Sequence, residues 1–466
     1  MSTEAALDSL MEEARSITGS SQSKVRDSIV NSIYQTAENI ASDVVSCTSP
    51  KRTDWDRKID NILTSRVWGF PIMFGVLAVV FWVTIAGANV PSSMLAAGLF
   101  WIEDRLTGFF MAMHAPAWFY GFLVLGVYRG LAWVVSVMLP PMAIFFSMFT
   151  LLEDLGYLPR VAFNLDRFFK KAGAHGKQAL TMSMGFGCNA AGIIACRIIE
   201  SPRERLIATL TNNFVPCNGR FPTLIALASI FVAGSVSLSF SSALATLAVA
   251  GLVAFGIAVT LFVSWTLSKT LLRGEPSSFT LELPPYRKPL VGQVLIRSVL
   301  DRTIFVLGRA VVIAAPAGGL VWILANTMVG DASVLSIVAG WLDPMARFMG
   351  LDGFILLAFI LGLPANEIVF PILIMSYVSG GTLMELDSLA DLRYLLVDQH
   401  GWTWLTALCT LVFSLCHWPC GTTLFTIQRE QKNWRWTVLA ALIPTTAGVV
   451  ACIMLNNLVC ALGLVY

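Results

Sequence analysis

The sequence predicts an all-α polytopic membrane protein, built as an inverted repeat of two halves with broken or re-entrant helices. The first observation is composition: 56% of the 466 residues are hydrophobic and 13% are charged, whereas soluble domains carry about 25% charged residues. The second is a series of apolar runs of membrane-spanning length. The third is a pair of breaks, Gly-x-x-x-Asn and then Pro-Cys, found at 185–217 and again at 362–420. Matched breaks in two halves are typical of a transport site near the bilayer midplane.

Charge and cysteine content exclude several protein classes. The net charge of +2 predicts no nucleic-acid partner. The nine cysteines are scattered, and several lie inside apolar runs, so they do not form the framework of a small disulfide-stapled protein. The segment 1–47 lacks the apolar core of a signal peptide. We therefore expect the first internal span to direct membrane insertion.

Residues 1–66 are polar and are predicted to be a cytoplasmic helical lead-in. Its apolar residues recur at helical spacing, which predicts an amphipathic helix lying on the membrane or on a partner. No Gly-x-x-x-x-Gly-Lys-Ser/Thr phosphate loop occurs in the chain, nor His-Glu-x-x-His or Gly-x-Ser-x-Gly. We therefore expect no enzyme, no catalytic residues and no nucleotide bound by this chain. The residues that set the helical period are Val25, Ile29, Ile33, Ala37 and Ile40.

Nine apolar runs follow the lead-in. A weaker run at 92–112 contains Glu103, Asp104 and Arg105 and is predicted to be a separate interfacial helix. Two prolines, Pro140 and Pro141, are expected to kink the second run. The runs are 69–88, 119–150, 179–198, 206–232, 240–268, 303–328, 353–378, 403–427 and 437–460.

The positions of Lys and Arg predict the topology. If 179–198 and 353–378 are re-entrant hairpins and the other seven runs cross, most of the 31 basic residues fall on one side together with the N-terminus. That side is predicted to be cytoplasmic. The hairpins then enter from opposite faces, as in an inverted repeat. Its halves would be residues 67–298 and 299–466, and the acidic stretch 385–398 would form an extracytoplasmic helix and loop.

The first half offers two cysteines beside polar breaks. Cys188 is followed by Asn189, and Cys217 follows a proline and precedes Asn218. Backbone groups freed by a break in lipid find no water, so such breaks are tolerated where they line a polar cavity. A thiolate binds borderline and soft divalent metals, and an amide supplies a carbonyl oxygen. The alternative is that each cysteine packs as a small apolar side chain.

The second half offers a different set of polar residues, Asn366, Glu367 and Cys420. A carboxylate inside a membrane predicts a functional site, although Glu367 would equally suit an ion pair with Arg309 or Arg220. Cys416 and His417 stand near Cys420 at a spacing that a metal cluster could use, but a buried, hydrogen-bonded histidine in the core is the alternative.

These motifs also resemble the ferrous iron transport protein B (FeoB) family. The resemblance spans roughly residues 53–460. It rests on the Leu-Glu-Asp-Leu-Gly-Tyr-Leu-Pro-Arg stretch at 152–160, Gly-Phe-Gly-Cys-Asn at 185–189, Arg-Glu-Arg at 203–205, and Pro-Cys-x-x-Arg at 216–220. The remaining matches are Glu-Leu-Pro-Pro-Tyr at 282–286, Pro-Cys-x-x-Thr at 419–423 and Arg-Glu at 429–430.

The resemblance implies uptake of Fe(II), as the transported ion, across the bacterial cytoplasmic (inner) membrane through two gate-type repeats. It assigns Cys188 and Cys217 to the family's gate motifs and Cys420 to its C-terminal Pro-Cys motif. Ala190 and Ala191 stand where the family has an apolar residue and proline. The family begins with a G domain that this sequence lacks, so a separate FeoB-like G protein and small FeoA-like accessory proteins are the expected partners. The oligomeric state stays open, a homo-oligomer included.

Two other functions remain open on the sequence. Gate-type repeats resemble those of nucleoside carriers, so a nucleoside or other small-solute transporter is one alternative. A non-transporting FeoB-like regulatory subunit is the other.

Overall fold

The structure, a computed structural model, describes residues 22–44, 55–65, 67–233, 238–274, 286–287, 289–378, 381–383 and 389–463. Within these ranges the regular secondary structure is helical apart from one short antiparallel hairpin, β1 (Met328–Val329) with β2 (Ala332–Ser333). Six helical stretches are long and apolar enough to cross a membrane, and one bent helix pair would make a seventh. The expected all-α, multi-pass membrane architecture is therefore confirmed.

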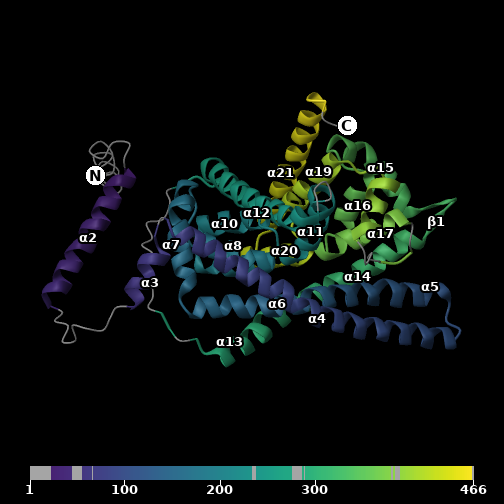
Figure 1. Cartoon of the computed structure of the whole chain (residues 1–466), viewed down its shortest axis with the longest axis horizontal. Helices are drawn as coiled ribbons and strands as arrows, with labels where there is room; N and C mark the ends of the chain where they lie inside the picture. The colour runs from purple at the N-terminus through teal and green to yellow at the C-terminus, as the bar shows by residue number, and fades with distance from the viewer. Residues whose placement is uncertain are drawn as a thin grey trace, which may run out of the picture.

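The lead-in forms the predicted helix α2 (Gln22–Val44), followed by α3 (Trp55–Leu63). Ile29, Ile33 and Ile40 of α2 are all more than half exposed, and α2 stands apart from the bundle (Figure 1). Residues 1–21 and 45–54 lie outside the described part of the chain.

The prediction of a separate interfacial helix at 92–112 is wrong. The chain instead continues without a break through Pro91 as one helix of 44 residues, α4 (Gly69–Ala112). Glu103 is buried and forms an ion pair with Arg129, at 3.4 Å between Oε1 and Nη1. The charge that interrupts the apolar run is thus paired with Arg129 of the neighbouring helix α6 (Arg129–Asp154), so α4 can continue alongside α6.

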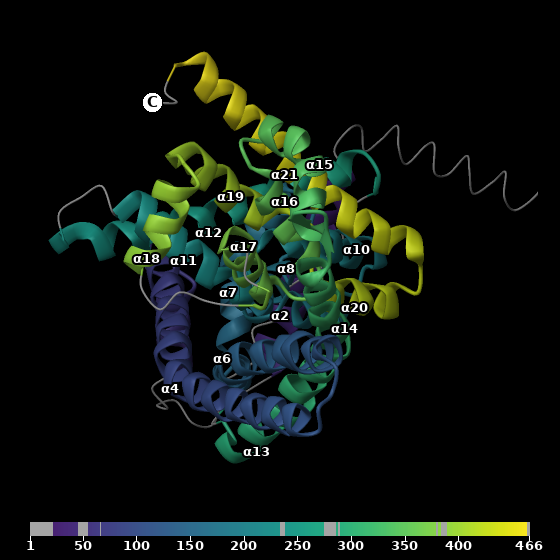
Figure 2. The same cartoon turned by 90° about the vertical axis from the view of Figure 1, so that its right-hand side faces the viewer.

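The rest of the first half packs around that helix. Figures 1 and 2 place α4 along the lower edge of the bundle and α21 at its upper edge. The helix α6 runs through both prolines as a single element. The elements are α5 (Ala117–Tyr120), η1 (Gly121–Tyr128), α6 (Arg129–Asp154), α7 (Tyr157–Lys171), α8 (Gln178–Gly187), α9 (Asn189–Ala195), η2 (Cys196–Ile198), α10 (Pro202–Thr211), η3 (Asn212–Phe214), η4 (Asn218–Arg220), α11 (Phe221–Ala228), η5 (Ser229–Ala233) and α12 (Leu238–Lys269).

The second half contains a helix, α15 (Val334–Phe348), that lies between two predicted apolar runs. Helix α15 precedes α16 and meets it at a bend of 109°. A short helix also lies in the predicted extracytoplasmic stretch, although residues 384–388 are outside the described part. The elements are α13 (Val291–Arg297), η6 (Ser298–Ile304), α14 (Phe305–Asn326), α15 (Val334–Phe348), α16 (Gly353–Leu361), η7 (Asn366–Ile368), α17 (Val369–Val378), α18 (Leu389–Arg393), η8 (Tyr394–Gln399), α19 (Trp404–Cys416), α20 (Gly421–Gln431) and α21 (Trp434–Ala461).

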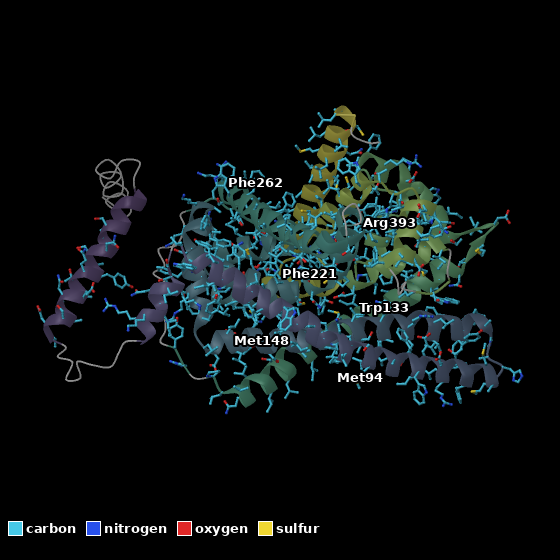
Figure 3. The ribbon with its side chains drawn as sticks, viewed as in Figure 1. Met94, Trp133, Met148, Phe221, Phe262 and Arg393 are labelled. Carbon is cyan, nitrogen blue, oxygen red and sulfur yellow. The ribbon has the colours of Figure 1, made fainter. Side chains whose placement is uncertain are left out.

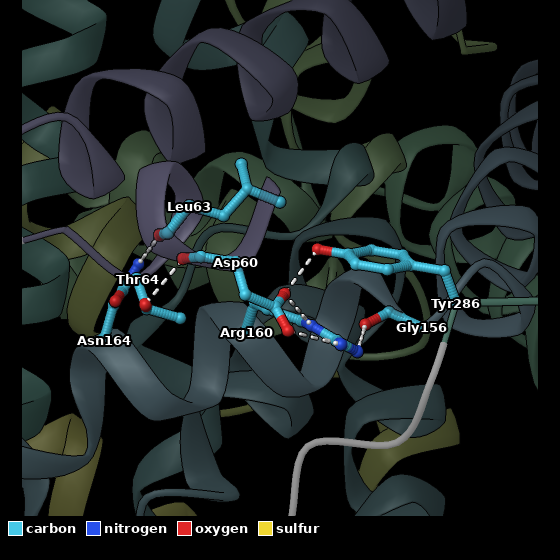
Figure 4. A network of polar contacts seen from close by, with 7 residues as sticks. All are labelled: Asp60, Leu63, Thr64, Gly156, Arg160, Asn164 and Tyr286. Carbon is cyan, nitrogen blue, oxygen red and sulfur yellow. Dashed lines mark hydrogen bonds and ion pairs between the residues drawn. The ribbon is translucent and has the colours of Figure 1, made fainter. Parts of the chain in front are cut away.

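A polar network joins three segments that the charge pattern placed on one face (Figure 4). Arg160 on α7 is 2% exposed and donates to both carboxylate oxygens of Asp60 on α3, at 2.9 and 3.2 Å. The Tyr286 hydroxyl donates to the same carboxylate at 2.7 Å, and its ring lies 4.1 Å from the guanidinium. The segments around residues 60, 160 and 286 therefore meet, as the topology requires.

Further ion pairs connect other segments that the charge pattern places on that face, around residues 177, 200 and 430. Arg197, just after α9, donates twice to Glu430 at 2.7 Å, and Lys177 forms an ion pair with Glu200 at 3.2 Å. The hairpin base thus contacts the end of α20, and the lead-in contacts α7 and the segment around Tyr286.

Two large apolar core clusters form the interior, one mainly from residues 310–459 and one from residues 80–221. Phe221 is 8% exposed and lies inside the bundle, whereas Met94 and Phe262 are 69% and 66% exposed and lie at its edges (Figure 3). Buried polar side chains, among them Asn189, Asn213 and Arg220, lie where the interrupted helices end.

Candidate functional site

The first hairpin is broken at Cys188. Helix α8 ends at Gly187, Cys188 is extended with φ −155° and ψ 126°, and α9 begins at Asn189. A Cβ on Gly187 would lie 2.3 Å from Phe145, so glycine allows α8 to approach α6 closely at the break. The predicted break is therefore present, with Cys188 at its turn.

The second hairpin is broken at the matching place. Helix α16 ends at Leu361, Ala365 is extended with φ −152° and ψ 127°, and η7 begins at Asn366. A Cβ on Gly362 would lie 2.2 Å from Val369, so a small residue is needed where the two arms meet. The backbone at Ala365 thus matches that at Cys188 within a few degrees.

The Pro-Cys breaks also adopt similar conformations. Cys217 is extended, with φ −81° and ψ 168°, and precedes η4. Cys420 is extended, with φ −61° and ψ 158°, and precedes α20. Both breaks lie inside stretches long and apolar enough to cross a membrane, where extended backbone is tolerated only away from lipid.

The four breaks converge on one interior region. The Gly421 N–H, just after Cys420, donates to the Leu363 carbonyl at 2.6 Å. Asn189, next to Cys188, and Arg220, just after Cys217, both donate to Asn213 Oδ1 at 3.2 Å. The Asn366 Nδ2 lies 3.6 Å from the Cys217 sulfur, so an amide of the second half contacts a thiol of the first. The structure therefore brings together Cys188, Cys217, Asn366, Glu367 and Cys420.

The convergence does not form a compact ligand set. Among the residues that the structure describes, no three or more His, Cys, Asp or Glu side chains are grouped closely enough to hold a metal ion. Cys188 and Cys217 are 8% and 7% exposed. The Cys420 sulfur lies 3.2 Å from the Thr423 hydroxyl. The thiols are thus neighbours that would have to move together to share an ion.

Glu367 faces the first half across the site. A Cβ on Gly219 would lie 2.2 Å from Glu367 Oε1, so the carboxylate packs against the bare backbone after Cys217. In the described part of the chain no ion pair within 4.0 Å joins Glu367 to Arg220. The side chain of Arg309, the other proposed partner, lies outside the described residues.

Arg220 instead joins the two halves through backbone carbonyls. It is 1% exposed, and its Nη1 donates to the carbonyl oxygens of Asn213 and Leu415, both at 2.9 Å. Its Nη2 donates to Asn213 Oδ1 at 3.2 Å and approaches the Trp418 carbonyl at 3.5 Å. Hydrogen bonds to several carbonyls offset part of the cost of burying this charge.

Two asparagines that the sequence analysis did not single out complete the site. Asn189 Nδ2 donates to Asn213 Oδ1 at 3.2 Å, and Asn213 Nδ2 donates to the His417 carbonyl at 2.6 Å. Asn212 Nδ2 donates to the Asn189 carbonyl at 3.2 Å. The Oδ1 atoms of Asn189 and Asn212 are buried, and neither has a hydrogen-bond partner in the described structure. The available signal was an Asn-Asn pair inside an apolar run, four residues before Cys217.

The remaining candidates lie at the margin. Asn218 starts η4, is half-buried and makes no hydrogen bond to the other candidate residues. His417 is 1% exposed, with Nδ1 2.9 Å from the Ser414 carbonyl and Nε2 3.3 Å from Asn366 Oδ1. Cys416 is buried in an apolar cluster with Phe214 and Leu415. His417 is thus a buried, hydrogen-bonded histidine that contacts the site, and Cys416 packs in the core.

Two protein families match the chain. The Gate family, described as nucleoside recognition, matches residues 135–231 and 307–434, and each segment contains one hairpin break and one Pro-Cys break. The family described as ferrous iron transport protein B C terminus matches residues 249–301. Together the matched segments cover more than half of the sequence.

Similar curated proteins are described as Fe(2+) transporters, alone or as part of a fusion. The Fe(2+) transporter FeoB of Staphylococcus aureus (strain MSSA476) is 27% identical over 87% of this chain and 60% of its own length. That of Methanocaldococcus jannaschii is 26% identical over 88% of this chain and 60% of its own length. A fusion of Fe(2+) transport protein A with FeoB from Porphyromonas gingivalis is 27% identical over 82% of this chain and 49% of its own length.

This chain therefore spans about 60% of the length of such relatives. No solved structure matches it.

Proposed function

We propose that this chain, which belongs to the FeoB family, forms the pathway by which ferrous iron crosses a membrane. The observation that carries the proposal is the meeting of four helix breaks in the interior, with three cysteine thiols, an amide and a carboxylate around them. The names of the relatives supply the ion. Fe(II) accepts both sulfur and oxygen ligands, so this mixed set suits it.

Cys188, Cys217 and Cys420 are proposed to bind the ion as thiolates. Thiols lose their protons when a metal binds, and Arg220 would offset the resulting negative charge from its position between the halves. Asn189, Asn218 and Asn366 would supply amide oxygens, and Glu367 a carboxylate. The thiols form no ligand set in the described structure, so binding requires the breaks to approach one another.

The two hairpins are proposed to act as opposing gates of an inverted repeat, with halves at 67–298 and 299–466. Their matching backbone at Cys188 and Ala365 supports this arrangement. The face that holds the lead-in, the hairpin base and the end of α20 would be cytoplasmic, in the inner membrane of a bacterium, because it collects the basic residues.

Two kinds of partner are proposed, one from the resemblance to the FeoB family and one from a relative. A G protein that regulates opening would act from the basic face, close to α3 and α7. An accessory protein like the A component is supported by the relative in which both components form one chain.

The experiment measures Fe(II) uptake into vesicles that contain the purified chain. Cys188→Ser and Cys217→Ser are expected to lower uptake at least about tenfold, since loss of a ligand interaction worth about 1.4 kcal/mol corresponds to a factor of ten. Cys460→Ser, an exposed cysteine outside the site, is the control and should transport normally.

Co(II) binding separates the two parts of the proposal. Thiolate-to-Co(II) absorption that is present in the wild type and lost in Cys217→Ser supports the site. Normal uptake by both variants would refute the site assignment, and no uptake by the wild type, with or without the candidate G protein, would refute the transport function.

A nucleoside carrier is the second candidate, because the matched Gate family is described as nucleoside recognition. Nucleoside that enters the vesicles by itself, and that competes with the metal ion, would favour this reading. A regulatory subunit would transport neither solute, whether or not the candidate G protein is added.

A further inference from the structure

A cavity of about 230 Å³ lies outside the metal path, between α4, α6, α7, α8 and α12. Its walls are formed by aromatic and aliphatic side chains from all five helices. Representative lining residues are Phe70, Phe74, Phe149, Phe168, Phe186 and Leu261.

The chemistry of the walls selects a hydrocarbon. The hydroxyl of Ser183, a rare polar side chain in the lining, already donates to the Ala179 carbonyl at 2.9 Å. An apolar cavity of roughly 150 Å³ stays dry and binds benzene. Tyr157 and Ser183 carry the hydroxyls of a lining that is otherwise hydrocarbon or thioether, so this larger cavity offers few partners to water and matches a flexible alkyl chain.

The cavity mouth is continuous with the membrane-facing surface. Phe74 and Phe168 line the cavity and are 55% and 48% exposed. On the same helix as Phe74, Val79 and Trp82 are 55% and 70% exposed. Since α4 is one of the candidate membrane spans, its exposed apolar side chains face lipid, and acyl chains lie directly beside the opening.

Basic residues near the cavity opening indicate which lipid headgroup would be favoured. Helix α7 has an apolar face that lines the cavity, and it ends with two exposed lysines, Lys170 and Lys171. Amphipathic helices with basic residues on the polar face lie at the membrane surface and attract anionic lipids. Lys170 also pairs with Asp166 at 2.7 Å, whereas no ion pair within 4.0 Å involves Lys171 in the described part of the chain.

We propose that this cavity binds one acyl chain of an anionic membrane phospholipid, with the headgroup beside Lys170 and Lys171. The chain enters between Phe74 and Phe168 and lies against Ala179, Met182 and Phe186 of α8. These three residues belong to α8, the arm of the first hairpin that leads to Cys188. The lipid therefore supports the gate helix from behind, on the side away from the metal path.

The test uses photo-crosslinking in vesicles of phosphatidylcholine with a minority of phosphatidylglycerol that carries a diazirine in its acyl chain. Mass spectrometry should find the label on the peptide with Met182 and Phe186, which are 4% and 3% exposed and are out of reach of bulk lipid. Absence of label on α8, with normal labelling of exposed Met454 on α21, would overturn the proposal.

Filling the cavity provides the matched comparison. Ala179→Trp should lower α8 labelling severalfold, whereas Val79→Trp, outside the cavity on the lipid-facing surface of α4, should not. Ser183→Leu is the milder variant in case the tryptophan prevents folding, which Met454 labelling reports. Unchanged α8 labelling in a folded filled variant would refute the site.

The headgroup is tested by a second arm. Lys170→Gln with Lys171→Gln should reduce α8 labelling by phosphatidylglycerol severalfold and leave labelling by diazirine phosphatidylcholine unchanged. Equal labelling by both lipids before and after the substitutions would refute the selection of anionic lipid. None of these measurements depends on iron transport.

Discussion

The turns of the two hairpins, here called tips, lie at Cys188 and Ala365 and have the same backbone conformation but different side chains. Cys188 and Ala365 have φ and ψ values that agree within a few degrees, and each is followed by a buried asparagine that starts a helical turn. The first tip carries a thiol where the second carries a methyl group. The second tip carries Glu367 where the first carries Ala190.

The difference shows that two turns with the same backbone conformation can carry different polar side chains. A sharp turn inside the membrane needs small residues and polar partners for its freed backbone, which both tips have. The identity of the side chain at the turn is free to differ. The proposed site would therefore be asymmetric, with sulfur mainly from the first half and oxygen from the second.

The largest expected effect comes from the residue that joins the halves. Arg220→Ala removes charge-assisted hydrogen bonds to carbonyls on both sides and should lower the free energy of unfolding by about 3 kcal/mol. Thermal unfolding in detergent measures it. Arg220→Lys keeps the charge but not the planar geometry and should recover only part of the loss. A stable Arg220→Ala protein would show that the halves are held by other contacts.

The two Pro-Cys breaks can be compared through their glycines. A Cβ on Gly219 would lie 2.2 Å from Glu367 Oε1, whereas on Gly421 it would lie 3.2 Å from the Cγ2 methyl of Ile313, a contact that a shift of a few tenths of an ångström relieves. Gly219→Ala should destabilise by about 2 kcal/mol, the cost of overpacking, and displace the carboxylate. Gly421→Ala should be neutral within about 0.5 kcal/mol. Equal effects of the two substitutions on the unfolding temperature would contradict the asymmetric packing.

Placing a thiol on the second tip tests whether the tips are equivalent. Ala365→Cys should increase thiolate-to-Co(II) absorption if both tips face the same ion, and it should partly restore Co(II) binding in a Cys188→Ser background. Ala358→Cys, a buried residue on the straight part of α16, is the control and should add no absorption. No gain from Ala365→Cys would limit the equivalence to the backbone.

The asparagines give a smaller effect. Asn366→Ala removes contacts with Cys217 and His417, whereas Asn189→Ala removes a hydrogen bond to Asn213. Each should cost about 1 kcal/mol in stability. Only Asn366→Ala is expected to change the pH dependence of alkylation of Cys217, because it alone contacts that sulfur. The same alkylation profile in both variants would argue against the contact across the halves.

The smallest effect concerns the face outside the membrane. Hydrogen bonding from Arg160 holds the pKa of Asp60 below its ordinary value of 3.8, and partial burial opposes this. The contribution of Asp60 to docking of α3 is therefore complete above that value and is lost as the pH falls through the lowered pKa. Protection of the α3 amides from hydrogen exchange, relative to an unstructured chain at the same pH, should fall modestly below about pH 4. In the Asp60→Asn variant this protection should be lower at neutral pH and should no longer depend on pH in that range.

The sequence predicted the breaks because breaks have a local cause. Glycine, proline and asparagine inside apolar runs placed both hairpins and both Pro-Cys turns, and the charge pattern grouped the segments around Asp60, Arg160 and Glu430. The continuation of α4 was missed because Glu103 looks like an interfacial residue until its partner on another helix is known.

The remaining site contacts were missed for a similar reason. The roles of Asn213 and Arg220 depend on carbonyls about two hundred residues away, which no local pattern encodes. The inverted repeat, the domain boundaries and the metal ligands stay predictions.

The bonds of Arg220 to the second half have a consequence for how the protein tolerates change. They end on the main-chain oxygens of Leu415 and Trp418, not on side chains. A substitution at either position therefore leaves the acceptor in place. Substitutions in that segment can therefore accumulate without a compensating change at Arg220, whereas no other side chain reproduces all the hydrogen bonds of the arginine.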